Sequence, residues 1–150
     1  MMKKIMTFLM AVTILLCFAA CKKSDPQTVT LNIEDSGVLG TYTLEADGDM
    51  VHTIKQTTTM DCTGFVEEQF TIIKEAASEY ETIYNTIKGV TYEVEITETS
   101  MVEKLTIDAT NKEALKELSD QGLMPVESGD YISLEKTVNS MEAEGWVVAK

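Results

Sequence analysis

The stretch Val-Thr-Tyr-Glu-Val-Glu-Ile-Thr at positions 90–97 decides the fold. Apolar and polar residues alternate through it, which is the pattern of a β-strand with one buried face and one wet face. Glu93 and Glu95 lie on the wet face together with two threonines. Because antiparallel sheets commonly keep one face on the core and the other in solvent, this strand predicts an antiparallel sheet.

The residues before this strand follow a helical period. Apolar side chains recur at spacings of four and three, and Gly89 is suited to the end of a helix. The stripe consists of Val66, Phe70, Ile73, Ala77, Tyr80, Tyr84 and Ile87, and it is widened by Ile72, Ala76 and Ile83. A stripe of this width predicts one long helix that packs on a sheet.

Four further stretches predict strands. Apolar and polar residues alternate at 29–33 and 38–45, and a threonine-rich strand is expected at 50–59. Asp47-Gly48 between the last two is a tight hairpin signal, because glycine accepts the positive φ of such turns. The residues at 101–109 form the expected hairpin partner of 90–97. The inward-facing side chains of these strands include Val38, Tyr42, Leu44, Leu105 and Ile107.

Two short helices complete the expected domain. Thr110 with Glu113 has the spacing of a capping box, which predicts a helix that ends at Gly122. The last helix begins after Ser133 and stops at Gly145. Each glycine brings a later side chain back onto its helix, Leu123 onto Leu118 and Trp146 onto Met141. The predicted class is therefore α+β, an antiparallel sheet of about five strands with helices packed on one face, in the order β-β-β-α-β-β-α-α.

The N-terminus has the features of a bacterial lipoprotein signal. A start with two lysines and a short apolar run end in Ala19-Ala20-Cys21, and small residues directly before a cysteine resemble a lipobox. We predict a lipoprotein signal peptide at 1–20 with cleavage after Ala20, and lipid attachment such as palmitate at Cys21. A lipid-anchored tether at 21–27 would then lead into a single α+β domain at 28–150.

Two other interpretations of this segment stay open. A transmembrane anchor needs about 20 apolar residues, and this run is shorter and is followed at once by Lys22 and Lys23. Plain secretion, with cleavage after Ala19 or Ala20 and no lipid, also fits the small residues. The lipoprotein interpretation is favoured by the cysteine that follows them. It places the domain outside the cytoplasm, on the cell membrane or the outer membrane.

The composition excludes several classes of partner. The formal net charge is −13 and the chain has no arginine, the residue best suited to bidentate phosphate contacts. Nucleic acid is therefore not an expected partner, whereas cationic partners are compatible with the charge. Of the three cysteines, Cys17 lies in the signal and Cys21 would carry lipid. Cys62 would then stand alone, so the domain should be held by its core without a disulfide.

Several motifs resemble the YehR-like family of small bacterial lipoproteins. Besides the lipobox, they are Tyr-Thr-Leu-Glu-Ala-Asp-Gly-Asp-Met-Val (42–51), the helix end from Glu79-Tyr80 to Lys88-Gly89-Val90, Leu-Thr-Ile-Asp (105–108) and Met-Glu-Ala-Glu-Gly-Trp (141–146). The resemblance covers the signal and nearly all of 28–150. It implies a lipid-anchored α+β domain. The family has no established biochemical activity, so the resemblance supplies no catalytic residue.

The sequence offers few candidates for chemistry. His52 is the only histidine, in phase with Met50 and Ile54 on its strand, and is expected to be a part-buried polar residue. Structural zinc requires four nitrogen or sulfur ligands, which His52 and Cys62 cannot supply. Reactive cysteines need an electropositive setting, and Asp61 works against one at Cys62, so we favour an inert residue over a nucleophile. The paired acids, Asp47 with Asp49 and Glu93 with Glu95, are best interpreted as a solvated acidic surface.

These observations predict a protein that is not an enzyme and has no cofactor, metal or catalytic residue. The expected function is a membrane-anchored envelope lipoprotein acting as a non-enzymatic interaction or accessory module. Its partners would be the membrane, through the lipid on Cys21, and an envelope protein. The alternative function is a lipoprotein that binds a small ligand or a cation in a pocket between sheet and helices.

Overall fold

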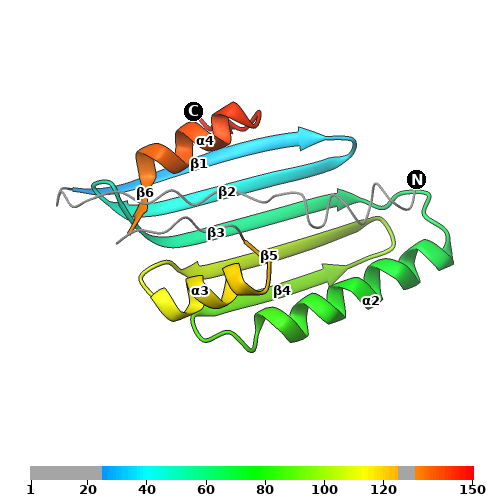
Figure 1. Cartoon of the computed structure of the whole chain (residues 1–150). Helices are drawn as coiled ribbons and strands as arrows, with labels where there is room; N and C mark the ends of the chain where they lie inside the picture. Colours follow the sequence, from blue (N-terminus) through cyan, green and yellow to red (C-terminus); the bar gives the residue numbers. More distant parts are fainter. Residues whose placement is uncertain (1–24, 125–130) are drawn as a thin grey trace.

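A single antiparallel sheet forms the body of the protein (Figure 1). The structure, a computed structural model, describes residues 25–124 and 131–150, so the predicted signal peptide with Ala20 and Cys21 lies outside the described residues. The order across the sheet is β4-β5-β3-β2-β1-β7, and β6 pairs with β3. The strands are β1 (Pro26–Asp35), β2 (Val38–Asp47), β3 (Met50–Asp61), β4 (Val90–Ile96), β5 (Ser100–Asp108), β6 (Ile132–Ser133) and β7 (Val147–Val148).

The α+β class and the antiparallel pairing are confirmed, but the strand count and the order are wrong. In the described part of the chain the order is β-β-β-α-β-β-α-β-α-β. The two additional strands, β6 and β7, have two residues each. A two-residue strand is too short to show an alternating pattern, so the sequence carries no signal for it. Both exist because longer strands, β3 and β1, offer free backbone groups for pairing.

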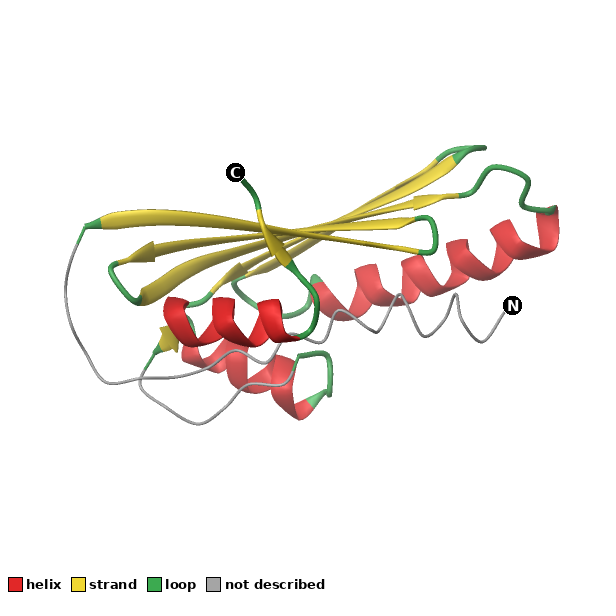
Figure 2. Ribbon diagram, turned by 90° about the horizontal axis from the view of Figure 1, so that it is seen from above, coloured by secondary structure: helices red, strands yellow, loops and turns green. Residues whose placement is uncertain are grey.

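Helices α2 (Glu67–Tyr84), α3 (Lys112–Asp120) and α4 (Leu134–Ala143) lie on one face of the sheet (Figure 2). The predicted extension of the long helix toward Gly89 is wrong, because α2 ends at Tyr84 with Asn85 as its C-cap. The Asn85 amide donates to the Tyr92 carbonyl at 3.0 Å and accepts from the Tyr92 N–H at 2.8 Å. Its side chain thus pairs with the outer edge of β4 and fixes the connection between helix and strand.

The predicted capping box of α3 is also wrong. Asn111 is the N-cap, and its side-chain oxygen accepts the Ala114 N–H at 3.1 Å. Thr110 instead donates both its N–H and its hydroxyl to Asp108. Two other predicted boundaries are confirmed. After α3 the Leu123 N–H donates to the Leu118 carbonyl at 2.9 Å, and Ser133 is the N-cap of α4.

The apolar interior consists of two clusters with a polar row between them, which consists of Thr58 and Glu103. The larger cluster lies between the sheet and helices α3 and α4, and Trp146 packs into it as predicted, with its N–H bonded to Met141 O. The smaller cluster consists of Val38, Met60, Cys62, Ile73 and Met101. Between them the register aligns Gly40, Thr58 and Glu103 on the helix-facing side of β2, β3 and β5. Among the described residues, no helix is long and apolar enough to cross a membrane.

Candidate functional site

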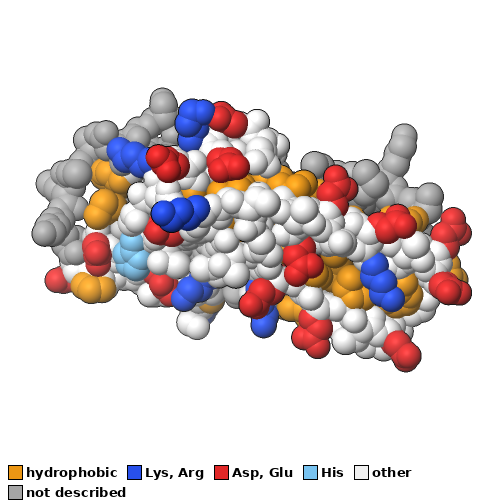
Figure 3. Space-filling model, turned by 90° about the horizontal axis from the view of Figure 1, so that it is seen from below, with side chains coloured by type: hydrophobic (Ala, Val, Ile, Leu, Met, Phe, Trp, Pro, Cys, Tyr) orange, Lys and Arg blue, Asp and Glu red, His pale blue; other side chains and the backbone are white. Residues whose placement is uncertain are grey.

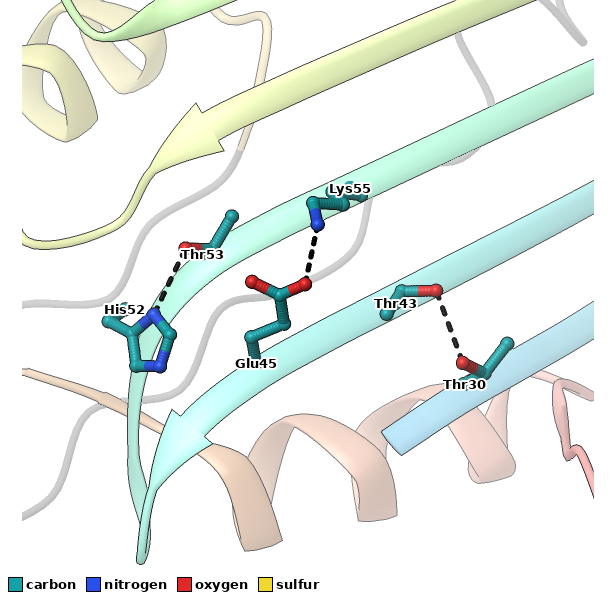
Figure 4. A network of polar contacts seen from close by, with 6 residues as sticks. All are labelled: Thr30, Thr43, Glu45, His52, Thr53 and Lys55. Atoms are coloured by element: carbon teal, nitrogen blue, oxygen red, sulfur yellow. Dashed lines mark hydrogen bonds and ion pairs between the residues drawn. The ribbon is translucent and has the colours of Figure 1, made fainter. Parts of the chain in front are cut away.

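The face of the sheet away from the helices is polar (Figure 4). Threonines from neighbouring strands lie side by side on it, and the hydroxyls of Thr30 and Thr43 are 3.2 Å apart. Lys55 and Glu45 form an ion pair with Nζ 2.5 Å from Oε1, and the lysine side chain is half exposed. Exposed pairs of this kind contribute about 0–1 kcal/mol. This face is therefore a solvated sheet surface without an assembled reactive centre among the residues described.

The predicted phase of His52 is wrong. The register shifts between Glu45 and Ala46, which pair with Thr53 and Val51, so His52 is the additional residue of a β-bulge. Val51, rather than His52, is buried on the helix side together with Ile54. The His52 Nδ1 lies 3.0 Å from the Thr53 hydroxyl, and the ring is half-buried beside the polar face. In the described part of the chain, no group of three or more histidine, cysteine or acidic residues could hold a metal ion.

Cys62 is a buried free thiol in the smaller apolar cluster. Its Sγ lies 3.7 Å from the Met60 carbonyl oxygen. Burial raises the pKa of the Cys62 thiol, and the neighbouring Asp61 carboxylate raises this pKa further. Both effects work against the thiolate that a nucleophile or a metal ligand requires.

One end of the sheet exposes apolar side chains. This end, which we call the distal end, carries the β1–β2 turn, the β4–β5 turn and the first turn of α2 (Figure 1). Leu39 is 46% exposed and Val66, which precedes α2, is 59% exposed. The chain enters the sheet at the opposite end, where Pro26 pairs with Asp47.

Two shallow hollows flank the β4–β5 turn at the distal end. The first, of about 380 Å³, is lined by Glu34, Gly37, Val38, Leu39, Thr59, Met60, Asp61, Thr99 and Ser100. The second, of about 440 Å³, is lined by Glu67, Phe70, Lys74, Ile96, Thr97 and Glu98. In the view from below, apolar side chains reach the surface toward this end among acidic ones (Figure 3). The distal end is therefore an apolar surface with a mainly acidic rim.

A buried carboxyl group lies on the opposite side of the sheet from the polar face. Glu103 is 9% exposed, and its Oε1 accepts a hydrogen bond from the Tyr92 hydroxyl. The Tyr92 ring stacks on Tyr84 with centroids 5.3 Å apart, and Tyr84 is 6.1 Å from Tyr80. We call Glu103 with Tyr80, Tyr84 and Tyr92 the acid–tyrosine cluster.

Burial dominates the electrostatics of this cluster. It raises the pKa of the Glu103 carboxyl, and the hydrogen bond from Tyr92 opposes the increase. Burial likewise raises the pKa of Tyr84 to about 12, and it raises the pKa of Tyr92 further, with the nearby Glu103 charge as the second cause. Burial also raises the pKa of Tyr80, so at neutral pH all three phenols are protonated and can donate hydrogen bonds.

The sequence carries one signal for Glu103. Glu103 shares the inward phase of its strand with Leu105 and Ile107, where an acidic residue is unusual. Tyr42 also lies in the inward phase of its strand, and its hydroxyl is buried without a hydrogen-bond partner among residues 25–124 and 131–150. A hydroxyl without a partner cannot be recognised before the surrounding side chains are placed.

The fold defines the class of the protein as a small α+β domain in which one antiparallel sheet carries its helices on a single face. The chain belongs to the family described as "Protein of unknown function (DUF1307)", whose model matches residues 27–147. No curated protein matches the chain significantly.

Two solved structures share the fold. The NMR structure of the E. coli YehR protein is 21% identical, with a TM-score of 0.58 over 88% of this chain and 94% of that one. The NMR structure of a protein from Streptococcus pneumoniae TIGR4 is 16% identical, with a TM-score of 0.52 over 89% of this chain and 90% of that one. The resemblance to a YehR-like domain is thus confirmed.

Proposed function

We propose that this protein is a lipid-anchored lipoprotein of the bacterial envelope whose domain acts as a non-enzymatic interaction module. Cys21 is the proposed site of lipid attachment after removal of residues 1–20, and the distal end is the proposed contact surface. The observation that carries the proposal is the exposure of Leu39 and Val66 beside two hollows at the end of the sheet farthest from the entering chain.

The direction of β1 supports this assignment. This strand has 10 residues and runs from Pro26 at the entry end to Asp35 at the distal end. At about 3.3 Å per residue, the strand spans roughly 33 Å. Because Cys21 precedes Pro26 by only a few residues, a lipid on Cys21 holds the entry end near the bilayer and presents the distal end away from it.

The chemistry of the distal end indicates the kind of partner. Glu34 and Asp61 line one hollow, and Glu67 and Glu98 line the other, where Lys74 is the one basic lining residue. An apolar centre with an acidic rim complements a protein surface that combines apolar and basic side chains. We therefore propose a basic envelope protein as the partner.

Lipid attachment is tested by growing cells with labelled palmitate and comparing the wild type with Cys21→Ser. The wild type should take up label into this protein and the variant should not. Equal labelling of both would remove the lipid anchor from the proposal.

The contact surface is tested by photo-crosslinking in cells. A photoreactive amino acid replaces Leu39 at the distal end or, as the matched control, Thr43 on the same strand and the solvated face of the sheet. We expect one reproducible envelope protein linked from position 39 and not from position 43. Leu39→Lys combined with Val66→Lys should abolish that product while leaving the thermal unfolding midpoint within a few degrees. The same products from both positions would show that the distal end is not a specific surface.

A further inference from the structure

The acid–tyrosine cluster is separate from the proposed contact surface, and none of its four residues lines either of the two hollows there. Glu103 comes from β5, Tyr92 from β4, and Tyr80 and Tyr84 from α2, so a sheet and a helix both contribute to it. Within the cluster the tyrosine rings form a row beside the carboxyl group: Tyr92 stacks on Tyr84 with centroids 5.3 Å apart, and the tilted Tyr80 ring lies 6.1 Å from Tyr84. Tyr80 and Tyr84 are half-buried, whereas Tyr92 is buried.

The buried acid has no basic partner in the described part of the chain. The ion pairs there join Lys55 to Glu45 and Lys116 to Asp120, and both lie at the surface. Glu103 is held by the neutral hydroxyl of Tyr92. Acidic side chains that are nearly fully buried are usually paired with a cation, so this one is an exception.

A second observation points to the same place. The Tyr42 hydroxyl is fully buried and has no hydrogen-bond partner in the described part of the chain, although buried polar groups nearly always have one. Tyr42 lies on the helix side of the sheet, and the proximity of Tyr84 contributes to the raised pKa of its phenol. Gln56, its cross-strand neighbour, donates to Thr58, which in turn pairs with Glu103 across the strands. Polar atoms thus extend from the cluster to Tyr42 across an otherwise apolar face.

These groups suit one class of ligand. An ammonium group is attracted both by a carboxylate and by the faces of aromatic rings, and aromatic cages recognise methylated ammonium ions in this way. The phenol hydroxyls can serve as hydrogen-bond acceptors for a primary amine. A divalent metal requires several oxygen ligands, and the described residues bring together no group of three acidic, histidine or cysteine side chains. An anion would be repelled by Glu103 and by the net charge of −13.

We propose that Glu103, with Tyr80, Tyr84 and Tyr92, binds a small organic ammonium ion, either a primary amine or a methylated ammonium. The carboxylate supplies the opposite charge and the tyrosine rings supply cation–π attraction. Tyr42 provides a further polar contact at the inner end of the site. The strongly acidic surface raises the local concentration of such cations.

The test uses the full-length protein in detergent at fixed ionic strength. Choline, tetramethylammonium and butylamine are titrated by calorimetry, and 3,3-dimethyl-1-butanol serves as the uncharged analogue of choline. Trp146 is the only tryptophan, and its ring centroid is 6.0 Å from that of Tyr42, so its fluorescence gives a second readout near the site. We expect saturable binding of at least one ammonium compound, with the uncharged analogue at least tenfold weaker.

Two variants and one matched control locate the site. Glu103→Gln keeps the size of the side chain and removes its charge, and it should weaken ammonium binding at least tenfold. Glu93→Gln removes an exposed charge from the polar face of the adjacent strand and should leave binding unchanged. Tyr84→Leu removes a ring face while keeping the acid, and it should also weaken binding if Glu103→Gln proves too unstable to measure. Equal binding by the wild type and Glu103→Gln, or no saturable binding by any of the three ammonium compounds, would overturn the proposal.

Discussion

The substitution Tyr42→Phe should stabilise the protein, although it removes a polar group from the centre of the core. The Tyr42 side chain is fully buried, and none of the residues that the structure describes forms a hydrogen bond with its hydroxyl. A hydroxyl buried without a partner loses its hydrogen bonds to water on folding, at a cost of about 1–3 kcal/mol in mutational studies. Phenylalanine retains the ring and its edge-on contact with Trp146, whose centroid is 6.0 Å away. We therefore expect a gain of about 1–2 kcal/mol in the free energy of unfolding.

The same chemical change at Tyr92 supplies the matched control, with the opposite sign expected. Its hydroxyl donates to Glu103, so Tyr92→Phe removes a buried hydrogen bond and leaves the carboxyl group without its partner. We expect a loss of about 1–3 kcal/mol. Urea unfolding at pH 7, followed by circular dichroism and by Trp146 fluorescence, measures both changes. Destabilisation of the Tyr42→Phe variant by more than about 0.5 kcal/mol would refute the reasoning, because the hydroxyl would then have a partner in solution.

Three further predictions test other parts of the structure. Glu103→Gln should stabilise the ligand-free protein at pH 7 but not near pH 4. Burial raises the pKa of this carboxyl above 4.5, so its ionisation favours the unfolded state and the stability of the wild type falls as pH rises from there. A pH-independent difference in urea midpoints would contradict this. Asp49→Ala should lower the free energy of unfolding by about 2–3 kcal/mol, because Asp49 accepts a hydrogen bond from the Ser133 hydroxyl at 2.8 Å and holds the start of α4. An unchanged melting temperature would refute that role. Gly40→Ala should lower the free energy of unfolding by about 1–3 kcal/mol, because the new Cβ would lie 3.0 Å from the Trp146 ring. The control Gly37→Ala separates crowding from backbone strain, because Gly37 has a positive φ but no described neighbour within 4 Å of an added Cβ.

The elements with a strong hydrophobic period could be predicted from the sequence. The strand at 90–97 was predicted almost to its ends, because its alternation reflects burial of one face against α2 and the core. The turn at Gly48 followed from a residue type that tolerates the positive φ observed there. The end of α2 could not be predicted in this way. Ile87 keeps the helical spacing, yet it is buried beyond the helix because the Asn85 side chain joins the edge of β4.

The acid–tyrosine cluster depends on the register, which the sequence pattern does not determine. Glu103 and Tyr92 were both in the inward phase of their strands, so each could be assigned to the helix side. Their contact arises because the β4–β5 pairing aligns Glu103 with Val94 and brings Tyr92 one diagonal step away. A two-residue shift of the hairpin that placed Glu103 opposite Ile96 would preserve both inward faces and separate the two groups. The bulge that displaces His52 is a similar local change that no period reveals.

The polar row across the sheet has a consequence for function as well as for stability. Thr58 and Glu103 lie between the two apolar clusters of the interior. Larger apolar side chains at these two positions would join the clusters into one. Sequences usually satisfy local rules throughout, and departures from them concentrate at functional sites. Tyr42→Phe and Glu103→Gln are both expected to stabilise the ligand-free protein, because each removes a buried group that lacks a full set of partners. If both stabilise while Glu103→Gln loses ammonium binding, the polar row is retained for its ligand. If both substitutions destabilise the protein, the polar row is a structural network and the proposed ligand site is refuted.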